Sequence, residues 1–122
     1  MISDEKTFKI IGICMDIHNS ITYGLAEKIY QEILELELTL QNIPFEREKT
    51  FKITYKGHIL KQTYKADFIV YNNIVIELKS LGGINDEHIG QTLNYMGLIK
   101  GKIGLIINFG LPKLEYKRVI RR

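Results

Sequence analysis

The sequence predicts a single domain of the α/β (α+β) class that spans residues 1–122. Residues 4–20 and 25–42 have helical spacing or helix-forming composition, and residues 86–100 follow a capping residue. Between and after them lie runs rich in Val, Ile, Phe and Tyr, which favour strands. The contents of 45% hydrophobic and 25% charged residues are those of an ordinary soluble globular protein.

Charge and cysteine content narrow the function classes. The net charge of +3 permits binding to nucleic acid without requiring it. The single cysteine, Cys14, excludes an internal disulfide framework and, by itself, a cysteine-ligated zinc or iron–sulfur site. No apolar run is long enough to cross a bilayer, and MISDEKTFK lacks the apolar core of a signal peptide. We therefore expect a cytoplasmic protein with no membrane partner.

Two helices are predicted before the first strand. In residues 4–20 the side chains of Phe8, Ile11 and Met15 follow helical spacing, and His18 lies near the end. A histidine there either complements the helix dipole or serves as an auxiliary metal ligand. The second helix, in a region running from Thr22 to Asn42, has no Gly or Pro after Gly24. Glu27 lies in its first turn, close to the Gly24 bend.

Residues 45–63 are predicted to form strands. Pro44 ends the helical region, residues 45–56 alternate between apolar and charged side chains, and Lys56-Gly57-His58 has turn composition. A short strand over residues 59–63 then leads into the next hairpin. Basic residues crowd this segment, which suits either an edge strand protected by lysines or a surface that contacts phosphates. They are Arg47, Lys49, Lys52, Lys56, Lys61 and Lys65.

The C-terminal third is predicted to hold a helix and two strands. Asn85 can cap the helix and Gly101 lies just past its end. Gln91 and Tyr95 are four residues apart and share a face of this helix, as does His88. Residues 102–109 form an apolar run typical of a central, doubly buried strand, and residues 111–122 suit an edge strand or a short helix.

The stretch from Tyr64 to Ser80 predicts two apolar strands around Asn72–Asn73, because Asn tolerates positive φ. Three charges interrupt this hairpin: Asp67, Glu77 and Lys79. Glu77 and Lys79 are two residues apart and project from the same face of a strand. Such charges are rare in a buried hairpin unless they are paired, bind a metal or take part in chemistry.

The register of this hairpin decides whether the two carboxylates meet. A strict two-residue turn at Asn72–Asn73 would place Asp67 opposite Leu78 and Glu77 on the other face. Asp67 opposes Glu77 only if the loop has an odd length, such as Tyr71–Asn73, or if one strand carries a bulge. We therefore predict an irregularity in this hairpin.

Several motifs together resemble the GxxExxY family of the PD-(D/E)XK nuclease superfamily. They are Gly24-Leu-Ala-Glu27-Lys-Ile-Tyr30, YKAD at 64–67, IELK at 76–79, HIGQTLNY at 88–95 and GLIINFG at 104–110. The resemblance covers essentially the full length in the right order. It implies a PD-(D/E)XK nuclease-like (restriction-endonuclease-like) core, a mixed central sheet flanked by helices in the order α-β-β-β-α-β.

The resemblance also implies roles for individual residues. Glu27, Asp67, Glu77 and Lys79 would be catalytic. Mg²⁺ or Mn²⁺ would be held by Asp67, Glu77 and the backbone carbonyl of Leu78, with His18 as an auxiliary ligand. Gln91, Tyr95 and Tyr30 would contact substrate. One departure is Ile21-Thr22-Tyr23, where the family usually has Leu-Gly-Pro, so the entry angle of the Glu27 helix is open.

Three functions follow from this resemblance. The first is a Mg²⁺- or Mn²⁺-dependent nuclease that hydrolyses phosphodiester bonds in DNA. The second is a structure-selective endonuclease of the Holliday-junction type, for which we expect a homodimer with two sites on one surface. The third is a non-catalytic module on the same fold that binds nucleic acid or docks a partner. The intact set of Glu27, Asp67, Glu77 and Lys79 favours the enzyme.

Overall fold

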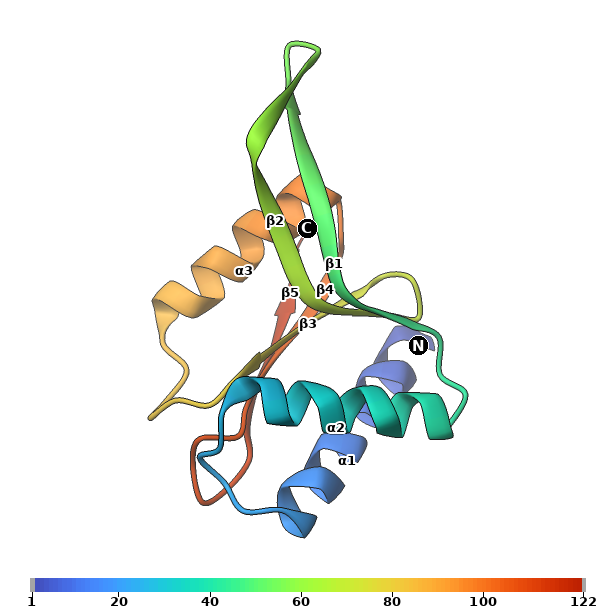
Figure 1. The fold of residues 1–122 in the computed structure, drawn as a ribbon, viewed down its shortest axis with the longest axis vertical. Helices are drawn as coiled ribbons and strands as arrows, with labels where there is room; N and C mark the ends of the chain where they lie inside the picture. Colours follow the sequence, from blue (N-terminus) through green and yellow to red (C-terminus); the bar gives the residue numbers. More distant parts are fainter. Residues whose placement is uncertain (1, 122) are drawn as a thin grey trace.

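The computed structural model describes the backbone of residues 2–121 and the side chains from Glu5 to Arg121. The chain forms a five-stranded mixed sheet with three helices (Figure 1). The strand order is β1-β2-β3-β4-β5; β3 and β4 are parallel, and all other neighbours are antiparallel. In chain order the elements are α1 (Ile2–Ser20), α2 (Glu27–Leu40), β1 (Phe45–Tyr55), β2 (His58–Val70), β3 (Ile74–Lys79), α3 (Asp86–Ile99), β4 (Ile103–Asn108) and β5 (Glu115–Ile120).

The sheet separates two apolar layers. Helices α1 and α2 cover one face, where Ile10, Cys14, Leu34 and Leu38 pack with strand residues such as Ile76. Helix α3 covers the other face through Met96, which packs with Val75, Ile106 and Val119. Because side chains alternate along β3, Ile74, Ile76 and Leu78 belong to the first layer, and Val75 and Glu77 face the second.

The expected helices form, with one correction at the start of α2. The helix is predicted over residues 25–42, whereas α2 starts at Glu27 with Ala26 as its N-cap. Gly24 has a φ of 81°, which glycine adopts readily, and its N–H donates to the Phe109 carbonyl at 2.9 Å. This bond ties residues 21–26 to the end of β4, so the chain turns there before it enters the helix.

The C-terminal elements match the prediction. Asn85 caps α3 in a reciprocal capping box with His88, and the helix ends at Ile99. Strand β4 lies between β3 and β5 and is buried along nearly its whole length, and β5 is an edge strand. None of the helices within residues 2–121 is both long and apolar enough to span a bilayer.

The predicted irregularity in the central hairpin is confirmed. Val70 pairs with Ile74 and Phe68 with Ile76, so the loop between the strands is Tyr71–Asn73. Tyr71 and Asn72 have positive φ values of 55° and 71°, which close this odd-numbered loop. The paired strands end at Phe68 and Ile76, and just beyond them Asp67 comes next to Glu77 and Leu78.

Strands β1 and β2 are much longer than the part of the sheet that they share with β3. The expected short strand at residues 59–63 is part of β2, which is one strand of 13 residues. Only Phe68–Val70 of β2 pair with β3, while pairing between β1 and β2 continues out to Tyr55 and His58. The outer half of this hairpin projects from the body of the molecule (Figure 1).

Two glycines should respond in opposite ways to alanine substitution. A Cβ at Gly110 would lie 2.1 Å from the Leu81 carbonyl oxygen, whereas a Cβ at Gly12, inside α1, meets nothing within 4 Å. We expect Gly110→Ala to lower the free energy of unfolding by about 2 kcal/mol or more. Gly12→Ala should raise it by up to about 1 kcal/mol. Urea unfolding measures both, and equal stability of the two variants would contradict this packing.

Candidate active site

Strands β2 and β3 part immediately beyond the Phe68–Ile76 pair, and Asp67 lies at this fork. The Leu78 N–H, which no longer faces a paired strand there, donates to Asp67 Oδ2 at 2.8 Å. In a β-strand the N–H and C=O of one residue point to the same side. The Leu78 carbonyl therefore also faces the Asp67 edge of β3, and its oxygen is available there as a ligand for a cation.

Glu77 projects from β3 beside Asp67 and is half-buried. Burial, together with the negative charge of Asp67, raises the pKa of Glu77 from 4.5 to about 8, although the Tyr64 hydroxyl donates a hydrogen bond to Glu77 Oε1. Burial and the neighbouring Glu77 carboxylate in turn raise the pKa of Tyr64 well above its usual range. The charge of Lys79 lowers the pKa of Glu77 but does not outweigh burial and Asp67, so the negative charge of the two carboxyls is only partly compensated.

Aromatic rings hold Tyr64 in place. Its ring stacks on Tyr95 with centroids 3.8 Å apart and on Phe51 with centroids 6.1 Å apart. Gln91 Nε2 donates to the Tyr95 hydroxyl at 3.0 Å. This stack connects β1, β2 and α3 and fixes the hydroxyl that contacts Glu77. Sequence reasoning included Tyr64 only as part of a motif, because its bond to Glu77 depends on the hairpin register.

A hollow of about 230 Å³ opens on the α3 side of the fork. Its walls come from β2, β3 and α3, and they include Tyr64, Glu77, Lys79, His88, Gln91 and Tyr95. Lys79 is two residues beyond Glu77 and shares its face of β3, as the alternation predicted. The side chains predicted to act on substrate, Gln91 and Tyr95, thus lie in one hollow with two of the predicted catalytic residues.

A second hollow, of about 540 Å³, lies on the α2 side. It is lined by Glu27, Gln31, Asp67 and Ser80, among others. Glu27 is the first residue of α2, so the bend at Gly24 sets where its carboxylate enters this hollow. The Ser80 hydroxyl is buried and has no hydrogen-bond partner among the described residues. Ser80 and Gln31 carried no signal in the sequence that separated them from ordinary polar residues.

Two predicted site residues lie elsewhere. Tyr30 is fully buried; its ring stacks on Phe109 at 4.3 Å and its hydroxyl donates to the Thr22 carbonyl at 2.6 Å. The structure therefore gives Tyr30 a structural role in the α2 bend and does not support substrate binding. His18 places Nε2 2.9 Å from the Leu111 carbonyl oxygen, and it lines neither of the two hollows.

A buried amide supports the turn after β3. Asn108 is fully buried at the end of β4; its Oδ1 accepts from the N–H of Leu81 at 2.9 Å, and its Nδ2 donates to the Leu81 carbonyl at 3.1 Å. Glu115 Oε1 accepts from Asn108 Nδ2 and from the Ile84 N–H. These bonds fix the chain that follows Lys79 and Ser80. Asn108 and Leu81 are 27 residues apart, and no pattern in the sequence indicates that they pair.

The oxygen atoms at the fork are suitable ligands for a hard divalent cation. Asp67 and Glu77 supply carboxylate oxygens and Leu78 supplies a carbonyl oxygen, which are the ligands that Mg²⁺ and Mn²⁺ prefer. A cation there would compensate the two neighbouring negative charges. No group of three or more His, Cys, Asp and Glu side chains suited to a metal occurs within the described residues. The remaining ligands of a bound ion would therefore be water or substrate.

The raised pKa of Glu77 predicts how stability depends on pH. A carboxyl with a raised folded-state pKa contributes stability that is complete below about pH 4.5 and lost as pH rises toward about 8. Glu77→Gln removes this loss and still offers an oxygen to Tyr64. In chelator-containing buffer, we expect the stability advantage of the variant to grow across this window and reach about 2 kcal/mol or more. Chemical denaturation at pH 5, 7 and 9 measures it; a difference that stays constant with pH would contradict the burial of an ionised Glu77.

The chain as a whole has counterparts among known proteins. Residues 4–119 match a family model described as "PD-(D/E)XK nuclease superfamily". A solved structure described as "Crystal structure of SSO0001" is similar with a TM-score of 0.60 and 24% identity, over 77% of this chain and 50% of that one. The chain thus spans about half the length of that protein, and the likeness concerns the fold alone. No curated protein matches the chain. The match is to the superfamily, so the GxxExxY grouping stays a prediction.

Proposed function

Since the chain belongs to the PD-(D/E)XK nuclease superfamily, we propose that it is a Mg²⁺- or Mn²⁺-dependent nuclease that hydrolyses phosphodiester bonds in DNA. The observation that carries this proposal is the fork between β2 and β3. There Asp67 lies beside Glu77, and Lys79 shares the face of Glu77. A purely structural hairpin gains nothing from placing two acids together at a half-buried position, because their repulsion and desolvation cost stability.

Asp67, Glu77 and the Leu78 carbonyl would hold the divalent cation. When bound, it neutralises charge on the phosphate and makes a coordinated water more acidic. The protein keeps the ligands in place: Leu78 N–H fixes one oxygen of Asp67, and Tyr64 fixes one oxygen of Glu77. Each carboxylate therefore retains a second oxygen for the ion. Such support around the ligands is what gives metal sites their geometry.

Lys79 supplies the positive charge of the site. Its ammonium lines the same hollow as Glu77 and can donate hydrogen bonds to an attacking water and to a non-bridging phosphate oxygen. We assign it this orienting and charge-stabilising role. Preorganised donors at the position where charge develops commonly provide a large part of the rate enhancement.

Gln91 and Tyr95 would position the DNA strand. They belong to the wall of the hollow that holds Lys79, and Gln91 Nε2 already donates to the Tyr95 hydroxyl. The Gln91 carbonyl oxygen then remains available to accept from a base or a sugar. On the other side of the fork, Glu27 and Asp67 line one hollow. From this hollow Glu27 would orient a water molecule that approaches from that side.

Metal binding tests the site without reference to turnover. Isothermal calorimetry with Mn²⁺ and with Mg²⁺ should give binding to the wild type that is lost in Asp67→Ala, because one of two carboxylate ligands is gone. Asp16→Ala, which removes an exposed carboxylate of α1, is the matched control and should bind as the wild type does. Absence of binding to the wild type, with DNA also present, would count against the enzyme and in favour of the non-catalytic module.

Cleavage tests the assigned roles. We expect Asp67→Ala and Lys79→Ala to lower the cleavage rate by about 100-fold or more while the thermal unfolding curve stays cooperative. Asp16→Ala should leave the rate unchanged. Branched, single-stranded and duplex DNA, each with Mg²⁺ and with Mn²⁺, are the substrates; cleavage confined to branched DNA would select the junction-type endonuclease. Full activity in purified Asp67→Ala would contradict the assignment of Asp67 to the active site.

A further inference from the structure

The outer half of the β1–β2 hairpin, residues 51–63, is here called the arm. The backbone of the arm pairs only within the β1–β2 hairpin, because β3 forms strand pairs with β2 at Phe68–Val70 alone. The register shifts between Lys52 and Thr54, and Gly57, with a φ of 78°, forms the tip. Figure 1 shows the arm standing clear of the body. An isolated two-stranded hairpin buries too little surface to gain much stability from its own packing.

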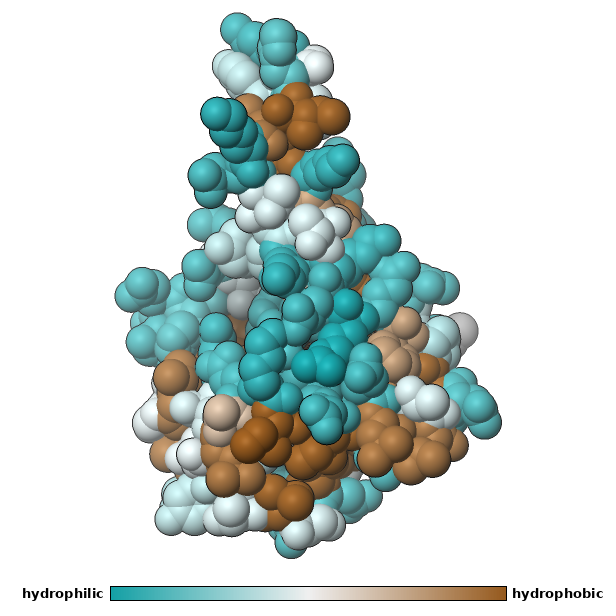
Figure 2. Space-filling model, in the orientation of Figure 1, coloured by the Kyte–Doolittle hydropathy of each residue, from teal (hydrophilic) through white to brown (hydrophobic). Residues whose placement is uncertain are grey.

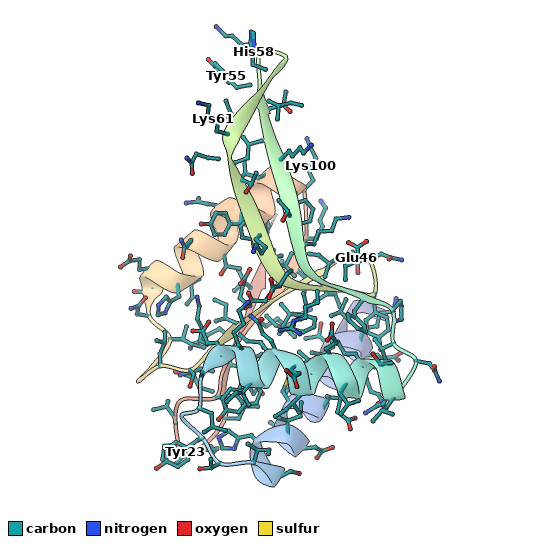
Figure 3. The ribbon with its side chains drawn as sticks, in the orientation of Figure 1. Tyr23, Glu46, Tyr55, His58, Lys61 and Lys100 are labelled. Carbon is teal, nitrogen blue, oxygen red and sulfur yellow. The ribbon has the colours of Figure 1, made fainter. Side chains whose placement is uncertain are left out.

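Apolar side chains on the arm are exposed. Tyr55 and Ile59 keep 63% and 65% of their surface accessible, and Leu60 keeps 41%. Figure 2 shows an apolar patch on the arm surrounded by hydrophilic side chains. In Figure 3, Tyr55, His58 and Lys61 point away from the ribbon into the surroundings. Exposed large apolar side chains that gather on a projecting element indicate an interaction surface.

The arm carries positive charge and no acid. It contains Lys52, Lys56 and Lys61, and no Asp or Glu occurs between Lys49 and Ala66. All three lysines are exposed, and none makes an ion pair in the described part of the chain. Figure 3 places Lys61 on the outer part of the hairpin.

The body end of the hairpin differs from the arm in its charge balance. Glu48 Oε2 lies 3.7 Å from Lys65 Nζ, Glu48 Oε1 pairs with Lys28, and Glu46 pairs with Lys49 at 2.9 Å. The hydrogen bond from Lys28 lowers the pKa of Glu48, which keeps it ionised. Within the hairpin, the basic residues that form ion pairs therefore lie near the body, and those without a described ion pair lie on the arm. A partner with negative charge would be drawn to the arm.

The arm begins at the candidate active site. Thr63, Tyr64 and Lys65 of β2 form one wall of the hollow that contains Glu77 and Lys79. From Lys49, which pairs with Ala66 beside Asp67, to Tyr55 at the tip, β1 runs for six residues, which at strand rise is about 20 Å; over the same span the register shift gives β2 extra residues that add no length. This length is somewhat more than half a turn of B-form DNA, whose turn is about 34 Å, and a two-stranded ribbon is narrow enough for the major groove.

We infer that the arm binds duplex DNA on one side of the phosphodiester bond held at Asp67 and Glu77. Lys52, Lys56 and Lys61 contact phosphates, and Ile59 and Leu60 lie against sugars and bases. The placement of the scissile bond rests on the proposed nuclease function, whereas the contact between arm and duplex does not. The substrate class is thus a duplex that extends at least about half a turn beyond the reacting phosphate.

A second copy of the chain fits the arm less well. Lysines on free strands oppose strand-to-strand pairing, and two arms brought together would repel each other. Lysine is also depleted from protein–protein interfaces, whereas lysines that contact phosphates are the general feature of proteins that bind nucleic acid. The lack of any acid on the arm therefore favours DNA.

Binding should be measured first without turnover. A fluorescent DNA duplex of about two turns is titrated with the full chain in chelator, across a range of salt concentrations. We expect Lys52→Gln/Lys56→Gln/Lys61→Gln to bind at least about tenfold more weakly, with a slope of log K against log salt shallower by about 2 to 3. The matched control, Lys9→Gln/Lys113→Gln/Lys117→Gln, removes the same charge from exposed sites on α1, β5 and the loop before β5, and should change affinity by less than about twofold.

A variant with a shortened arm tests whether the arm itself, and not only its lysine charges, is needed for binding to the duplex. Lys52 pairs with Thr63, so replacing residues 53–62 by Asn-Gly closes a two-residue hairpin and keeps the Phe51–Tyr64 stack. We expect this variant to bind the two-turn duplex as weakly as the triple lysine variant, and to bind Mn²⁺ as the wild type does. Its cooperative thermal unfolding and its metal binding show that the body is folded.

Each outcome separates the two proposals. Wild-type affinity in both arm variants would overturn the arm's role even if the enzyme cleaves DNA normally. Failure of the wild type to bind the duplex, or a dimer in sedimentation that disappears when the arm is shortened, would also overturn it. Duplex binding that depends on the arm, in a protein that cleaves no DNA, would support the arm and refute the nuclease.

Discussion

The structure depends on the register between β2 and β3. Closure of the hairpin by Tyr71–Asn73 sets Val70 against Ile74, and this pairing both fills the core and aligns the acids. A shift of one residue would turn Ile74 and Ile76 away from α1 and α2 and would bring Glu77 into the apolar layer. The free energy of core packing therefore enforces the geometry of the site, because the chain cannot lose one without losing the other.

The site itself works against stability. Glu77 is half-buried beside aromatic side chains and close to a second carboxylate, which makes its ionisation costly in the absence of a cation. The surrounding packing offsets this cost: the Tyr64 ring is fixed by Phe51 and Tyr95, and Asn108 fixes the turn beyond Lys79. Polar groups buried within such networks are preorganised, so an incoming ion needs little rearrangement of the protein.

Much of this structure could be predicted from sequence periodicity, because periodicity shows which side chains share a face of one helix or strand. Alternation placed Glu77 with Lys79, and the need for an odd loop predicted the register. Contacts between distant elements have no such signal. Tyr30 lies three residues from Glu27 and belongs to the same motif, yet its ring enters the core against Phe109. Helical spacing shows which residues lie side by side on a helix. It cannot show that the chain before α2 folds back over Tyr30. The support from Asn108 is hidden for the same reason.

Strand β2 connects the two ends of the molecule. It carries Asp67 at the fork, Tyr64 at the wall of the hollow and Lys61 on the arm. Because β2 is one continuous strand from the arm to Asp67, a duplex held by the arm would lie close to Asp67, within the length of the strand. The bulge between Lys52 and Thr54 increases the local twist, so the outer face of the arm is rotated relative to the hollow. Duplex DNA also rotates along its axis. A twisted ribbon that continues into the strand carrying Asp67 can therefore follow a groove and lead the duplex toward the carboxylates.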